Sequence, residues 1–78
     1  MPISNKIKFI MSESKKSRTD IAEALQISEA AVSNKLYRDS FDAEDLIKIA
    51  DCVGYQLAFF NEDNKIELTL KDIREKGG

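Results

Sequence analysis

The chain has 78 residues, 42% of them hydrophobic and 33% charged, with 12 Lys and Arg against 14 Asp and Glu. This length and balance predict one globular domain, and no apolar run approaches the about 20 residues needed to span a bilayer. The sequence lacks His, a Gly-rich phosphate loop and metal-spaced cysteines. We therefore expect no enzyme, and no catalytic residue, metal or cofactor.

The net charge of −2 is unevenly distributed along the chain. Residues 1–40 carry seven Lys or Arg against five Asp or Glu, whereas residues 41–78 carry five against nine. Because affinity for a polyanion depends on local charge, the N-terminal half is the candidate for such a contact. The single cysteine, Cys52, excludes an internal disulfide, and the N-terminus lacks a signal-peptide pattern, so we expect a cytoplasmic protein.

The first predicted helix covers residues 4–13, with Ser4 or Asn5 as its N-cap. A polar connection over residues 12–17 follows, and it carries Lys15 and Lys16. These two cations fit a solvated loop and a contact with an external anion equally well. Apolar residues at helical spacing usually pack into a core, and here they are Ile7, Ile10 and Met11, with Ile3 and Phe9 as additional candidates.

Two short helices joined by a tight turn are predicted next, at residues 18–25 and 28–37. Ser17 followed by Asp20 is a capping signature for the earlier helix. Gln26 lies in the turn, and Ser28 restarts the helical pattern as the second cap. The inward residues at helical spacing are Ile21, Ala22, Leu25, Val32 and Leu36.

The outer face of the second of these helices lacks the Lys and Glu residues that usually cover a solvated helix. At about 100° per residue, the side furthest from the core carries Ala30, Asn34 and Tyr37, with Ser33 at its edge. Compact or planar side chains suit a helix lying in the DNA major groove, where they reach base edges. Lys35 and Arg38 flank this face, as cations would beside a phosphate backbone.

A fourth helix is predicted from its cap Asp42 to Gly54, which ends it. Glu44 and Asp45 lie in its first turn, where the helix dipole explains acidic residues without any catalytic or metal-binding role. Its core residues are predicted to be Leu46, Ile47, Ile49, Ala50 and Val53.

From residue 55 the helical spacing changes to alternation, which predicts a β-hairpin over residues 55–70 with the turn N-E-D-N at 61–64. A lone hairpin is marginal in water and its edges invite pairing. We therefore expect dimerisation through an intersubunit sheet or through its apolar face, although a hairpin that only covers its own bundle fits as well. Residues 71–78 are predicted to be a flexible charged tail. The candidate dimerisation residues are Tyr55, Leu57, Phe59, Phe60, Ile66, Leu68 and Leu70.

The chain resembles the phage repressor and Cro-type helix-turn-helix family (XRE-like, lambda-repressor-like) in two runs, T-D-I-A-E-A-L-Q-I-S-E-A-A-V-S-N-K-L and D-L-I-K-I-A-D-C-V-G. The resemblance implies a mainly α fold, a bundle of four helices over residues 1–54 ahead of the hairpin, in which the third helix reads DNA, usually as a homodimer. Two departures matter. Where the family often has Gly this chain has Gln26, and a left-handed conformation there would cost roughly 1–2 kcal/mol. Leu36-Tyr37-Arg38 replaces the family's frequent Glu-x-Gly.

Residues and resemblance together predict a sequence-specific transcriptional regulator. The expected protein is a small prokaryotic, phage or mobile-element repressor whose dimer binds a palindromic operator in double-stranded DNA. The base-reading candidates are Glu29, Ala30, Ser33, Asn34 and Tyr37, and the phosphate-contact candidates are Lys15, Lys16, Ser17, Arg18, Lys35 and Arg38.

Alternatives to these assignments remain open from the sequence alone. The helix dipole is a sufficient reason for Glu29 at a helix start, and Arg18 would equally well pair with a nearby carboxylate. At the level of the whole chain, the alternative is an antitoxin or protein-interaction module that uses the hairpin to bind a protein partner.

Overall fold

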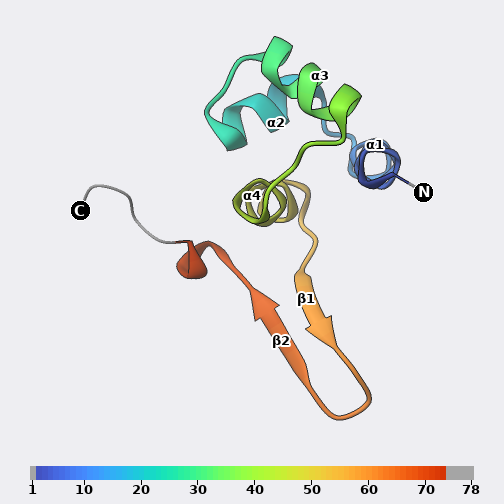
Figure 1. Cartoon of the computed structure of the whole chain (residues 1–78), viewed down its shortest axis with the longest axis vertical. Coiled ribbons are helices and arrows are strands. Elements are labelled where there is room, and N and C mark those ends of the chain that lie inside the picture. Colours follow the sequence, from blue (N-terminus) through green and yellow to red (C-terminus); the bar gives the residue numbers. More distant parts are fainter. Residues whose placement is uncertain (1, 74–78) are drawn as a thin grey trace.

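Four helices and a two-stranded hairpin lie within residues 2–73, the part of the chain that the computed structural model describes. Figure 1 shows the helices gathered at one end of the molecule and the hairpin extending away from them. The predicted mainly α bundle of four helices with a C-terminal β-hairpin is confirmed. The elements are α1 (Ile3–Ser14), α2 (Arg18–Leu25), α3 (Glu29–Arg38), α4 (Ala43–Val53), β1 (Leu57–Phe60), β2 (Lys65–Leu68) and a short 3-10 helix, η1 (Leu70–Asp72).

The core is formed by residues from all four helices. Its most completely buried large side chains are Ile21 of α2 and Val32 of α3, each only 1% exposed. Both lie at the inward positions that helical spacing predicts, because an amphipathic helix buries one stripe of its surface. The other buried members of the cluster are Ile7, Met11, Ala22, Leu25, Leu36, Ile49 and Val53.

Three of the helices begin at the cap residues that the sequence predicts. The side chains of Ser17, Ser28 and Asp42 each accept a hydrogen bond from a backbone N–H three residues further on. At Ser17 and Asp42 the third residue returns a bond to the backbone of the cap, which completes a capping box. These caps fix where α2, α3 and α4 begin.

The start of α1 differs from the prediction. Its N-cap is Pro2, and Ser4 lies inside the helix, so neither Ser4 nor Asn5 is the cap. The polar groups of Ser4 have another partner, since its backbone N–H and its hydroxyl donate to Oδ1 of Asp39 at 2.6 and 2.8 Å. This contact ties the start of α1 to the residue that ends α3.

Each of the four α-helices ends at a residue in the left-handed conformation. Only Gly54, with φ 77°, is of the type that adopts it freely. Lys15, Gln26 and Asp39 adopt it at φ 58°, 58° and 55° although each carries a Cβ. Of these three, Asp39 uses its side chain to bind Ser4, whereas Gln26 stands where the resembled family often has Gly.

The helix α4 buries residues on two sides. Ile49 and Val53 belong to the bundle core, but Ile47, although only 6% exposed, lies outside that cluster. Ile47 lines a small cavity with Tyr55 and Leu68, at the base of the hairpin. Ile47 is therefore buried as predicted, although it does not belong to the bundle core.

The hairpin pairs β1 and β2 antiparallel, with Leu57 opposite Leu68 and Phe59 opposite Ile66. Residues directly opposite each other share a face, so these four form one apolar face of the sheet. Phe59 and Ile66 are 70% and 63% exposed, whereas the two leucines nearer the helices are half-buried. The sheet thus contacts the bundle only at its base (Figure 1).

A few predicted positions fall elsewhere. Phe9 is 64% exposed and Ile3 is 44% exposed, so neither is a core residue. Tyr55 and Leu70 lie outside the strands, since β1 begins at Leu57 and β2 ends at Leu68. After β2, Thr69 caps η1 and turns the chain, so Leu70 does not extend the strand. Of the predicted flexible tail, Lys71 and Asp72 belong to η1, and residues 74–78 lie outside the described residues.

Replacing Gln26 with Gly should stabilise the fold, because Gly adopts φ 58° without the Cβ clash that the glutamine carries. The greater flexibility of Gly in the unfolded chain offsets part of this effect, so we expect a net increase of about 1 kcal/mol in the free energy of unfolding. Thermal unfolding followed by circular dichroism should register a rise in Tm of about 4–8 °C.

The matched control is Gln56→Gly, since the structure assigns no positive φ to Gln56. This variant should be neutral or less stable. Equal effects at the two positions would mean that the backbone at Gln26 is not strained.

Candidate nucleic-acid interface

The face of α3 that the sequence predicts to read DNA is open to solvent. Tyr37 is 89% exposed, Ala30 and Asn34 are also exposed, and Ser33 is half-buried. The opposite face of the same helix is held in the core by Val32 and Leu36. In Figure 1, α3 lies at the end of the molecule furthest from the hairpin turn. The helix α3 is thus separated from the hairpin turn by the rest of the bundle.

Arg18 links the start of α2 to this face. Its guanidinium Nη1 donates to Oγ of Ser33 at 3.3 Å. The alternative pairing of Arg18 with a carboxylate does not occur among residues 2–73, whose ion pairs involve other side chains. Arg18 thus sets a positive charge beside the edge of the α3 face.

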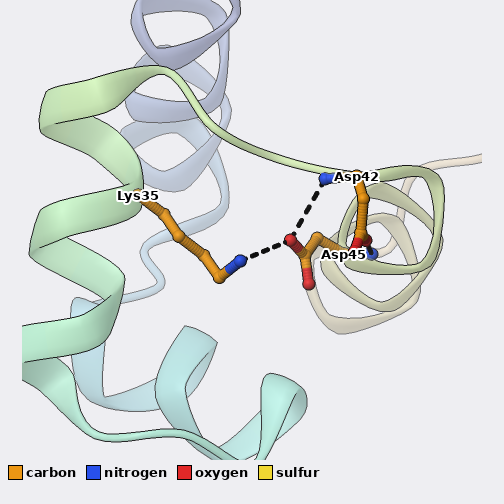
Figure 2. A network of polar contacts seen from close by, with 3 residues as sticks. All are labelled: Lys35, Asp42 and Asp45. Carbon is orange, nitrogen blue, oxygen red and sulfur yellow. Dashed lines mark hydrogen bonds and ion pairs between the residues drawn. The ribbon is translucent and has the colours of Figure 1, made fainter.

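Lys35 has a partner that the sequence does not predict. Its Nζ lies 2.8 Å from Oδ2 of Asp45, and the hydrogen bond raises the pKa of the Lys35 ammonium above its ordinary value. Figure 2 shows this side chain reaching from α3 to the start of α4, where the same carboxylate oxygen accepts the backbone N–H of Asp42 at 3.2 Å. Lys35 therefore fastens α3 to α4, and a phosphate contact would have to share this ammonium.

The other predicted phosphate contacts lie in the connection between α1 and α2 and at the end of α3. Lys15, Lys16 and Arg38 are exposed. Ser17 is exposed as well, but its groups already serve the α2 cap, since its backbone N–H donates to Oδ2 of Asp20 at 2.9 Å. That hydrogen bond, followed by the one from the Ser17 hydroxyl, lowers the pKa of Asp20 below its ordinary value.

Glu29 and Asp39 mark the two ends of α3. Glu29 is exposed in the first turn, where the helix dipole favours a carboxylate. At the other end, the hydrogen bonds from the backbone and the hydroxyl of Ser4 lower the pKa of Asp39 below its ordinary value. The exposed face of α3, which the sequence predicts to read bases, thus lies between a cap at Ser28 and a tertiary contact at Asp39.

The rest of the described chain offers little other chemistry. Among residues 2–73, no three His, Cys, Asp or Glu side chains gather in a way that could hold a metal ion, and no helix is both long and apolar enough to cross a membrane. Cys52 is half-buried against the core, where burial raises the pKa of its thiol. Its Sγ lies 3.8 Å from the carbonyl oxygen of Asp20, a position typical of a packing residue.

Comparison with known proteins found no match for this chain among protein-family models, curated proteins or solved structures.

Replacing Asp39 with Asn should reduce stability in a pH-dependent way. Because the pKa of Asp39 is lower in the folded state, its charge stabilises the fold above the ordinary Asp value of about 3.9. This stabilisation is lost as the pH falls through the folded-state pKa. Urea unfolding should therefore find Asp39→Asn less stable than the wild type at about pH 7, with the difference shrinking below about pH 4.

Asp63→Asn, in the exposed hairpin turn, is the matched control and should change stability little at either pH. If the deficit of Asp39→Asn were instead constant down to acid pH, the charge of Asp39 would not be what stabilises the contact with Ser4.

Proposed function

We propose that this protein is a sequence-specific DNA-binding regulator of transcription, a small cytoplasmic repressor of the phage repressor and Cro type. The proposal rests on the difference between the buried and the exposed side of α3. One side is locked into the core by Val32 and Leu36, and the other presents compact polar or planar groups to solvent beside Arg18 and Arg38. A helix that enters the major groove needs both properties, because it must be rigid and must fit between two phosphate backbones.

The proposed contacts divide into two kinds. Asn34 is the main base-reading residue, because its amide can bind adenine N6 and N7 together. Ala30 fits a thymine methyl, and Glu29 can accept from a cytosine amine. The exposed Tyr37 and the half-buried Ser33 extend the same face. The phosphate contacts come from exposed cations around it, which are Lys15, Lys16, Arg18 and Arg38.

The proposed regulator acts as a homodimer on a palindromic operator. Two copies of α3 would enter major grooves separated by a whole number of helical turns, each of about 34–36 Å. Because few cations surround the α3 face and the net charge is −2, non-specific affinity should be modest. Specific contacts to bases therefore carry more of the discrimination.

The exposed aromatic residues of the hairpin support a second candidate, a protein-interaction module such as an antitoxin. Phe59 and Phe60 are 70% and 79% exposed, and exposed apolar side chains that lie together often mark a protein-interaction site. The two functions are separable, because selection from a randomised duplex pool should enrich a palindrome only if the protein reads DNA. Failure to enrich any sequence at low salt would favour the protein-interaction module.

Asn34→Ala should weaken binding to the enriched site by about 1–3 kcal/mol while leaving binding to random DNA nearly unchanged. Fluorescence anisotropy with both duplexes measures this difference. Asn64→Ala removes the same group at the hairpin turn and should bind like the wild type. Equal losses of affinity on the two duplexes would contradict base reading by Asn34.

Arg18→Ala should weaken binding to the enriched site and to random DNA alike, because a phosphate contact carries no sequence information. The slope of log affinity against log salt should fall by about 1 for each half-site. Lys71→Ala, in η1 after the hairpin, is the control and should leave the slope as it is. A slope unaffected by Arg18→Ala would remove this residue from the phosphate contacts.

A further inference from the structure

The outer half of the hairpin has no partner within the described part of the chain. Phe59, Phe60 and Ile66 are 70%, 79% and 63% exposed, and they lie on both faces of the sheet. A sheet of only two strands is marginal in water and leaves two edges unpaired. The backbone groups and charged side chains along the β2 edge indicate which partner pairs with it.

The free edge of β2 is defined by the hydrogen bonding of the turn. The backbone N–H of Asn61 donates to the carbonyl of Asn64 at 2.9 Å, so Asn64 turns its backbone groups toward β1. The backbone N–H and C=O groups of successive residues in a strand point to opposite edges. The backbone groups of Ile66 and Leu68 therefore also point toward β1. The N–H and C=O groups of Lys65 and Glu67 point outward and are available to another strand.

Only one register of pairing between two copies of β2 brings opposite charges together. A two-fold antiparallel pair that uses these outward groups is centred on Lys65, Ile66 or Glu67. The registers centred on Lys65 and Glu67 place each of those residues opposite its own symmetry mate, which repels it. In the register centred on Ile66, Lys65 lies opposite Glu67 of the partner subunit. The strand is thus complementary in charge to a second copy of itself.

The edge of β1 has no comparable signal. Its outward backbone groups belong to Ala58 and Phe60, and the strand L-A-F-F contains no charge that would select a register. A strand whose register is weakly specified pairs in several ways. The β2 edge is therefore the one built for a defined partner.

We propose that a second copy of this chain pairs along β2 in the register centred on Ile66, which joins the two hairpins into one four-stranded antiparallel sheet. The N–H of Lys65 donates to the carbonyl of Glu67 of the partner subunit and receives a bond in return, and the two-fold axis repeats both bonds. On the apolar face, Phe59 and Ile66 of each copy form one continuous row across the sheet. The inference is independent of the proposed DNA binding, because it uses only the hairpin.

Within one chain, Lys65 already has two side-chain partners. Its Nζ lies 3.6 Å from Oε1 of Glu67 in the same strand, and it also donates to Oε1 of Gln56. All of these groups are exposed, and exposed ion pairs contribute little to stability. A test therefore has to separate attraction within a strand from attraction between subunits.

Two variants with opposite charge changes distinguish attraction within a strand from attraction between subunits. Sedimentation equilibrium measures the dimerisation of each variant alone and of their mixture. Lys65→Glu places like charges opposite each other in the homodimer, and so does Glu67→Lys, so each variant should dimerise about tenfold more weakly than the wild type. In an equimolar mixture, the acidic strand of one variant lies opposite the basic strand of the other. The mixture should therefore form a heterodimer about as stable as the wild-type dimer.

The outcomes are distinguishable. Attraction within a strand predicts no rescue in the mixture, because each strand still carries only like charges, and that result would overturn the proposal. A wild-type chain that stays monomeric would also overturn it and would leave the hairpin to a different protein. Lys8→Glu, the same charge change on the exposed surface of α1, should dimerise like the wild type. If it dimerised as weakly as Lys65→Glu, net charge and not the β2 register would control association.

Discussion

The burial of Ile21 against the same core as Val32 is the constraint on which the rest of the molecule depends. These two side chains bring α2 and α3 together, and by fixing the inward side of α3 they also fix which side remains outside. A chain of 78 residues has room for few such side chains. Polar contacts supplement them, as where Ser4 holds Asp39 and where Lys35 holds Asp45.

Much of this fold is predictable because its signals are local in the sequence. A cap and the residue three positions later, as at Ser17 and Asp20, define a helix start without any tertiary information. The cap of α1 is not predictable in this way, since Ser4 binds a residue 35 positions away. Phe9 fits the helical spacing of a core residue, but a helix on the outside of a small bundle has more apolar positions than the core can cover.

In the candidate site, too, the sequence predicts only those positions that local spacing determines. The outward position of Asn34 follows from the helical period once Val32 is known to be buried, and the structure places it there. The direction of Lys35 depends on how α3 packs against α4, and no spacing rule connects it with Asp45. The contact between Arg18 and Ser33 likewise arises only when α2 and α3 are packed together. Side chains at an edge between two helices are therefore the ones that sequence places least well.

Because α4 buries residues on two sides, the hairpin and the bundle should differ in the free energy needed to open them. Opening of the hairpin would uncover Ile47 but leave Ile49 and Val53 in the bundle core. Local opening of this kind costs less free energy than global unfolding. The amide hydrogens of β1 and β2 should therefore exchange with solvent through this local opening, and they should be less protected than those of the bundle. A ligand of the hairpin would slow both kinds of exchange, because global unfolding also releases it, whereas a ligand of α3 would slow only the slowest exchange of the bundle.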